Sequence, residues 1–173
     1  MTTLAAAVRE AAYLEGDFLL RSGKRSSYYL DKYRFGTEPT LLRRLGVAIG
    51  ETIREHAPTA QRIGAPELGA VSLAAAASLE VGLPFVIVRK QAKEYGTANR
   101  IEGPFVDGEE VVLVEDVVTS GGAAISAIEA LREAGLKVST AICVVDREEG
   151  GADELARIGI RLRPLLLASE LRS

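Results

Sequence analysis

The stretch from Val111 to Ala123 constrains the fold of this chain most strongly, because it joins an apolar strand, a tight turn and the start of a helix. Residues 111–114 are all apolar and mostly β-branched, which is typical of a strand covered on both faces in a parallel sheet. Residues 119–122 are small enough for a tight turn, and Ala123 to Ala134 has the apolar spacing of a helix. This order predicts a phosphate site, because backbone N–H groups at a helix start bind anions.

Two adjacent acids, Glu115 and Asp116, follow the predicted strand and precede this turn. Their carboxylates can accept hydrogen bonds from the hydroxyls of a ribose attached to the phosphate. The chain has neither Gly-x-x-x-x-Gly-Lys nor Gly-x-Gly-x-x-Gly, so the sequence disfavours an ATPase and a dinucleotide-binding protein. We therefore expect a ligand that contains one phosphoribosyl unit.

Residues 111–123 resemble the phosphoribosyl-pyrophosphate (PRPP) signature of type I phosphoribosyltransferases. The resemblance implies an acid pair, with Asp116 taking part in catalysis, and a phosphate loop. The residues that it places against PRPP here are Glu115, Asp116, Thr119, Ser120, Gly121, Gly122 and Ala123. The signature identifies the donor but not the base that accepts the ribose, and some proteins with this fold are regulators rather than enzymes.

The composition is that of one soluble globular domain spanning residues 1–173, with 47% hydrophobic and 26% charged residues. A net charge of −3 gives no general basic surface, so we expect no nonspecific nucleic-acid binding. Cys143 lies in an apolar run and is predicted to be a buried core residue. Glu80 and the Gly82-Leu83-Pro84 break argue against a membrane span. With no secretory signal at the N-terminus, we expect a cytoplasmic protein.

The N-terminal part, about residues 1–36, is predicted to form a small hood before a core of about residues 37–173. Thr3 to Tyr13 reads as a helix, and the polar turn Ser-Gly-Lys-Arg-Ser between two apolar segments predicts a β-hairpin. The hairpin resembles the hood of orotate phosphoribosyltransferases, with their pattern Phe-x-Leu-x-Ser-Gly-x-x-Ser-x-x-Tyr. That resemblance implies orotate contacts for Lys24 and Phe35.

A long helix is predicted from an N-cap at Thr37 to about Ala57, because apolar residues recur there at helical spacing. His56, the only histidine, falls at the end of this helix, where a cation suits the helix dipole, so we expect a structural or surface role.

Residues 62–65 are predicted to begin the main sheet, followed by a turn at 66–70 and a helix at 71–80. The turn resembles the pyrophosphate loop of orotate phosphoribosyltransferases, which implies backbone contacts from Glu67, Leu68 and Gly69. An ordinary helix-entry turn remains the alternative for Gly69.

Phe85 to Val88 is predicted to be a second buried strand, leading into a polar, basic loop at residues 89–103. Cations at the carboxyl end of a parallel strand suit an anion that closes under a lid. The loop resembles the pattern Arg-Lys-x-x-Lys-x-His-Gly of orotate phosphoribosyltransferases, except that a tyrosine stands where the family has histidine. The resemblance implies PRPP contacts from Arg89, Lys90, Lys93 and Tyr95, with Lys93 catalytic.

Lys137 to Val145 is predicted to be another buried strand, followed by a polar turn that contains Arg147. At this Asp-Arg turn the orotate family implies a contact between the arginine and the orotate carboxylate, which a planar guanidinium can grip with two hydrogen bonds. The same family implies a further orotate contact from Thr119. Residues 152–158 and 161–168 read as a short helix and a closing strand.

The sequence thus predicts an α/β protein with the type I phosphoribosyltransferase fold: a mainly parallel five-stranded sheet, helices on both faces and a small N-terminal hood. The resemblance implies transfer of the phosphoribosyl group from PRPP to orotate in pyrimidine biosynthesis. It also implies Mg²⁺ carried by PRPP rather than held by the protein alone, and a homodimer that shares the basic loop. The alternatives are transfer to another base and a PRPP-binding regulator without activity.

Overall fold

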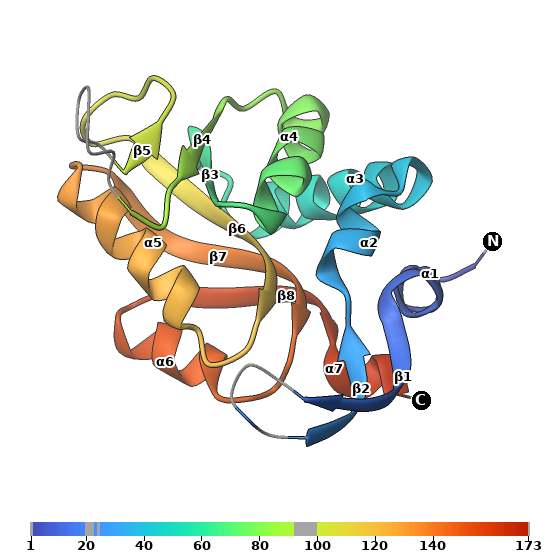
Figure 1. The fold of residues 1–173 in the computed structure, drawn as a ribbon. Coiled ribbons are helices and arrows are strands. Elements are labelled where there is room, and N and C mark those ends of the chain that lie inside the picture. Colours follow the sequence, from blue (N-terminus) through green and yellow to red (C-terminus); the bar gives the residue numbers. More distant parts are fainter. Residues whose placement is uncertain (1, 20–22, 24, 92–99, 173) are drawn as a thin grey trace.

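The computed structural model describes residues 2–19, 23, 25–91 and 100–172. The centre of the fold is a sheet of six strands in the order β5-β4-β3-β6-β7-β8 (Figure 1). Five strands run parallel, which confirms the mainly parallel α/β sheet. The sixth strand, antiparallel β5, lies within the segment 89–103 that was predicted to be a loop, and two residues are too short for a recognisable pattern. The strands are β3 (Arg62–Pro66), β4 (Phe85–Val88), β5 (Ile101–Glu102), β6 (Glu110–Val118), β7 (Lys137–Asp146) and β8 (Arg161–Leu167).

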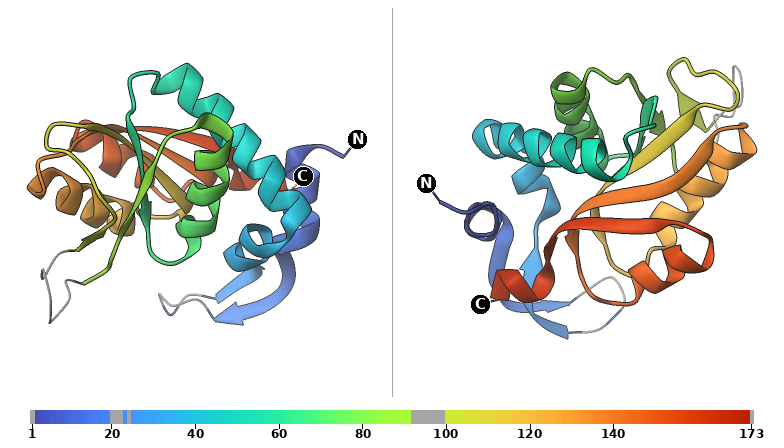
Figure 2. Two further views of the ribbon diagram at one scale, coloured as in Figure 1. Left: turned by 90° about the horizontal axis from the view of Figure 1, so that it is seen from above. Right: turned by 180° about the vertical axis from the view of Figure 1, so that it is seen from behind.

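Helices cover both faces of this sheet (Figure 2). Alternate residues of β6 point to opposite faces: Val112 and Val114 join the core under α3 and α4, whereas Val111 and Leu113 join the core under α5 and α6. A strand with apolar residues on both sides must be covered twice, as the sequence predicted. The covering helices are α3 (Pro39–His56), α4 (Gly69–Val81), α5 (Gly122–Glu133) and α6 (Gly151–Arg157).

The hood consists of a separate two-stranded antiparallel sheet and adjoining helices (Figure 1). The pairing of β1 with β2 confirms the predicted hairpin, although β1 begins at Tyr13, earlier than expected, because Tyr13 already pairs with Leu30. A C-terminal helix, which the sequence did not indicate, follows β8 and packs beside the N-terminal helix. These elements are α1 (Leu4–Ala12), β1 (Tyr13–Leu19), β2 (Arg25–Leu30), α2 (Lys32–Thr37) and α7 (Ala168–Arg172).

The predicted N-cap at Thr37 was wrong, because a separate short helix, α2, ends at that residue. The Thr37 hydroxyl donates a hydrogen bond to the Tyr33 carbonyl within α2. Glu38 caps α3 instead, and its two carboxylate oxygens accept hydrogen bonds from the N–H groups of Thr40 (3.1 Å) and Leu41 (2.6 Å). A carboxylate can satisfy two of the free N–H groups at a helix start, whereas a hydroxyl usually satisfies one.

Strand β6 extends beyond the predicted end at Val114, so the two acids lie inside the strand rather than after it. Glu115 pairs with Cys143, and the ladder to β7 continues as far as Val118. Cys143 is fully buried, as predicted, and burial raises the pKa of its thiol, which disfavours a nucleophilic thiolate. Across the described ranges, no helix is long and apolar enough to cross a bilayer.

Candidate active site

The carboxyl ends of β3, β4, β6 and β7 open into a cavity of about 610 Å³, which α2 borders on the hood side. Parallel strands place the residues that follow them at one edge of the sheet, and this edge is where ligands bind in open α/β folds. The charged residues in its lining are five cations and three acids: Lys32, Arg89, Lys90, Arg100 and Arg147, with Glu67, Glu115 and Asp116. The excess of cations suits a ligand with several negative charges.

Next to this cavity, the turn between β6 and α5 forms a cup of about 80 Å³ that is lined by residues 117–124 and Glu115. Gly121 precedes α5 with a φ of 83°, and no side chain caps the helix. The first N–H groups of an uncapped helix lack partners and can bind an anion. Gly121 also lies against the backbone of Gly151, where an added Cβ would be 3.2 Å from the carbonyl oxygen. The cup therefore has the shape and the donors for a phosphate.

Glu115 and Asp116 are both buried, with 6% and 0% of their surface exposed. Because neighbouring residues of a strand point to opposite faces, Glu115 lines the phosphate cup while Asp116 faces α2 and the start of α4. Burial, and then the charge of Asp116, raise the pKa of Glu115 well above its usual range. The two acids therefore differ in the part of a ribose phosphate that they can reach.

Two buried polar atoms on the cavity residues have no hydrogen-bond partner among the described residues: Asp116 Oδ2 and Arg147 Nε. The first lies 2.9 Å from Lys32 Nζ as an ion pair, outside hydrogen-bond geometry. Buried polar groups are nearly always satisfied in folded proteins, so an unsatisfied acceptor and an unsatisfied donor on one cavity indicate a site that a ligand completes.

Arg147 is held at the cavity by contacts to its backbone and its side chain. Its N–H donates to the Val118 carbonyl (2.8 Å), which fixes the turn after β7 to the end of β6. Its guanidinium lies 4.9 Å from the ring centre of Tyr28 in the hood and 3.0 Å from a carboxylate oxygen of Glu149. The side chain is only 11% exposed. A guanidinium fixed in this way can present its remaining donors to a planar anionic group.

The turn between β3 and α4 borders the cavity and is tied to the end of β4. The Glu67 carboxylate accepts a hydrogen bond from the Lys90 N–H (2.7 Å) and lies 3.9 Å from Arg89. Its side chain is thereby turned toward the basic segment, and the peptide bond from Glu67 to Leu68 is cis. No side chain caps α4, so N–H groups at its start remain available for an anion.

Comparison with known proteins gives a consistent result. The family model of the phosphoribosyl transferase domain matches residues 42–158. The orotate phosphoribosyltransferase of Halobacterium salinarum is 50% identical over 97% of this chain and 94% of its own length. This chain belongs to the orotate phosphoribosyltransferase family. Among solved structures, the orotate phosphoribosyltransferase of Mycobacterium tuberculosis in complex with PRPP has a TM-score of 0.83 and 30% identity, covering 98% of this chain and 97% of that one.

The structure brings most of the residues predicted for an orotate phosphoribosyltransferase to one place. The main cavity is lined by Glu67, Leu68, Arg89, Lys90, Glu115, Asp116, Thr119, Ala123 and Arg147. Ser120, Gly121 and Gly122 line the adjoining phosphate cup. Gly69 lies against Asp116. Lys24, Lys93 and Tyr95 lie outside the described residues.

Phe35 departs from the contact that the orotate phosphoribosyltransferase hood suggested. It is fully buried in the core and does not line the cavity. Tyr29 and Tyr33 line it instead. Helix α2, which was not predicted, turns Phe35 toward the core.

Lys32 and Arg100 also line this cavity, and neither was predicted as a site residue. Arg100 is oriented by hydrogen bonds to the Arg89 carbonyl (3.1 Å) and to Ser126 Oγ (3.1 Å). Arg100 could have been predicted from the sequence as one more cation of the basic loop. Lys32 had no such signal, because it precedes Asp116 by 84 residues.

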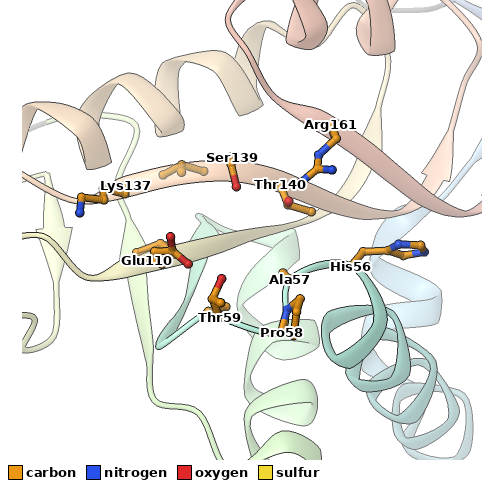
Figure 3. Close-up of a pocket in the computed structure, with 12 residues that line it drawn as sticks. His56, Ala57, Pro58, Thr59, Glu110, Lys137, Ser139, Thr140 and Arg161 are labelled. Carbon is orange, nitrogen blue, oxygen red and sulfur yellow. The ribbon is translucent and has the colours of Figure 1, made fainter.

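A second cavity, of about 330 Å³, lies at the opposite edge of the sheet, where β6, β7 and β8 begin (Figure 3). His56, Lys137 and Arg161 are among the residues that line it (Figure 3). The two cavities share no lining residue, so His56 is remote from the candidate active site.

We expect Gly69→Ala to reduce kcat/KM for PRPP by about thirtyfold while the protein stays folded. A Cβ atom at Gly69 would overlap Asp116 Oδ2 and lie 2.8 Å from its Cγ, so the carboxylate must move. Steady-state kinetics and thermal unfolding measure the two effects. Gly16→Ala in the hood is the matched control, since the atoms nearest to its methyl group belong to the Phe18 ring and not to the candidate site. Unchanged kinetics in Gly69→Ala would contradict the close fit.

Proposed function

We propose that this protein transfers the 5-phosphoribosyl group from PRPP to orotate, forming orotidine 5′-monophosphate and diphosphate on the route to UMP. The observation that carries the proposal is the pair of unsatisfied buried atoms, Asp116 Oδ2 and Arg147 Nε, on one cation-rich cavity beside a phosphate cup. An acceptor for ribose hydroxyls and a donor for a carboxylate are the two groups that PRPP and orotate require. The names of the relatives support the same reaction.

In the proposed reaction the base nitrogen attacks ribose C1 as the bond from C1 to the diphosphate oxygen breaks. Positive charge grows on the ribose ring and negative charge on the diphosphate. The cup at the start of α5 holds the 5′-phosphate, and the acid pair orients the ribose through its hydroxyls. Arg89, Lys90 and Lys93 stabilise the charge on the departing diphosphate. The reaction ends with diphosphate and a new C1–N bond, and the proton of the attacking N–H group passes to the diphosphate or to water.

Mg²⁺ belongs to this proposal as a companion of PRPP. Among the described residues, no three His, Cys, Asp or Glu side chains gather as in a metal site built by protein alone. The phosphate and diphosphate oxygens of PRPP would then supply most of the ligands, as is usual for Mg²⁺ bound with phosphates. Bound Mg²⁺ neutralises part of the charge on the leaving group.

Incubation of the protein with PRPP, Mg²⁺ and a panel of bases tests the reaction. We expect orotidine 5′-monophosphate and diphosphate from orotate, with no product from adenine, hypoxanthine or uracil. A nucleotide formed from another base would instead favour the wider phosphoribosyltransferase family. PRPP binding without turnover of any base would indicate a regulator.

Arg147→Ala is expected to raise the KM for orotate by about thirtyfold, because a lost charge-assisted contact costs about 2 kcal/mol. The KM for PRPP should change by less than about threefold, since the proposed partner of Arg147 is the orotate carboxylate. Steady-state kinetics with each substrate varied in turn give both values. Arg161→Ala at the opposite edge of the sheet is the matched control. Equal changes in both KM values would place the carboxylate contact elsewhere.

We further propose a cytoplasmic homodimer in which the basic loop of one subunit reaches the donor site of the other. The family resemblance motivates the shared loop, and Lys93 is its proposed catalytic residue. The cytoplasmic location fits charged, phosphorylated substrates, which do not cross membranes unaided. Sedimentation at several protein concentrations measures the subunit number.

A further inference from the structure

Lys32 connects the hood to the acid pair. It is the first residue of α2, which is fixed in place because the Asp31 carboxylate accepts a hydrogen bond from the Tyr33 N–H (3.2 Å). The Lys32 ammonium lies 2.9 Å from Asp116 Oδ2 and donates a hydrogen bond to Oδ1 (3.2 Å). The Asp116 side chain is 1% exposed, and that of Lys32 is 39% exposed. This lysine is therefore a partly solvated cation placed on a buried carboxylate.

The surroundings of Asp116 leave its carboxylate little freedom. Oδ1 accepts a hydrogen bond from the Val117 N–H (2.6 Å). On the other side, Gly69 lies so close to Oδ2 that a Cβ atom on Gly69 would overlap it. Lys32 is the cation that faces both oxygens. The ammonium thus fixes the direction of the carboxylate as well as balancing its charge.

The charges of the neighbouring groups make this balance necessary. Two adjacent carboxylates in a buried strand repel each other, and Glu115 next to Asp116 has a raised pKa through burial and that repulsion. Burial also acts to lower the pKa of Lys32, but its hydrogen bond with Asp116 and the nearby negative charges outweigh burial and raise that pKa overall. Lys32 is therefore a cation throughout the neutral range, and the carboxylate that it contacts is that of Asp116.

We propose that Lys32 is a positioning residue of the donor site: it holds the Asp116 carboxylate in the orientation in which it accepts hydrogen bonds from the ribose hydroxyls of PRPP. The inference rests on the proposed function only in taking PRPP as the ligand. Lys32 acts through Asp116, so its loss affects the donor more than the base. Because Lys32 belongs to the hood, PRPP binding also requires that the hood packs correctly on the sheet.

The test compares Lys32→Met, Lys32→Gln and Lys32→Arg with wild type, by calorimetric titration with PRPP and Mg²⁺ and by steady-state kinetics. We expect Lys32→Met and Lys32→Gln to weaken PRPP binding about tenfold, while the KM for orotate changes less than about threefold. We expect Lys32→Arg to bind PRPP within about threefold of wild type. Lys137→Met, which removes an exposed lysine at the opposite edge of the sheet, is the matched control.

A pH profile separates positioning from a merely structural role. Burial raises the pKa of Glu115 to about 8 and the positive charge of Lys32 lowers it, so removal of Lys32 should move the acidic limb of kcat/KM for PRPP to higher pH. Lys32→Arg should keep the wild-type limb. Lys32→Gln retains a hydrogen-bond donor but not the charge, so it should shift the acidic limb as Lys32→Met does.

Three results would overturn the proposal: PRPP binding within about twofold of wild type in Lys32→Met, equal losses for both substrates without rescue by arginine, or an unshifted acidic limb. If Lys32→Met folds poorly, the same measurements on Lys32→Gln test the proposal. A wild-type protein that binds PRPP but makes no nucleotide from orotate would refute the proposed reaction and leave the calorimetric test of Lys32 valid. A wild-type protein that does not bind PRPP would refute both.

Discussion

Asp116→Asn is expected to lower kcat/KM for PRPP by about a thousandfold, because it removes roughly 4 kcal/mol of charge-assisted hydrogen bonding from the donor site. Oδ1 accepts a hydrogen bond from the Val117 N–H, and the Lys32 ammonium lies 2.9 Å from Oδ2 as an ion pair. An amide must turn its NH₂ group toward one of them, so the substitution removes a charge and adds a repulsive contact. Initial rates with PRPP varied at saturating orotate measure the loss.

The control for this variant is Asp153→Asn, the same chemical change at an exposed acid on α6 outside the cavity. Thermal unfolding of both variants shows whether the fold is kept. PRPP kinetics that stay near wild type in a folded Asp116→Asn protein would remove the acid pair from the donor site and with it the basis of the proposed function.

Mixed dimers give the second large expected effect. Lys93→Ala should lose about a hundredfold or more in kcat, because it removes a cation from the departing diphosphate. If Lys93 acts on the neighbouring subunit, a dimer of one Lys93→Ala chain and one Asp116→Asn chain has one site with both defects and one site with neither. Equal amounts of the two variants, refolded together, should then recover about a quarter of wild-type activity under random pairing.

The control is each variant refolded alone, with mixed dimers identified by mass spectrometry. If Lys93 acts within its own subunit, every site in the mixed dimer keeps one defect and activity stays at the level of the variants. Absence of recovery with mixed dimers present would thus exclude the shared site, without bearing on the donor role of Asp116.

Short-range chemistry made several parts of the site predictable. The phosphate cup depends on consecutive residues, since a buried strand, four small residues and a helix specify an anion site by themselves. The strand and turn around Arg147 were predictable for the same reason. Where a single local pattern competed with another, prediction failed: Glu38 displaced Thr37 as the cap of α3 because its carboxylate serves two N–H groups.

The sequence by itself determined the parallel α/β sheet, the covering of both its faces and the tight turn before α5, because each follows from a repeat of apolar residues or from the backbone freedom of small residues. Only the tertiary structure decided that β6 carries its two acids inside the ladder with β7, and that α2 turns Phe35 into the core. It alone placed Lys32 on Asp116 across 84 residues of chain. An ion pair between distant residues depends on how the hood packs on the sheet, and no local pattern encodes that packing.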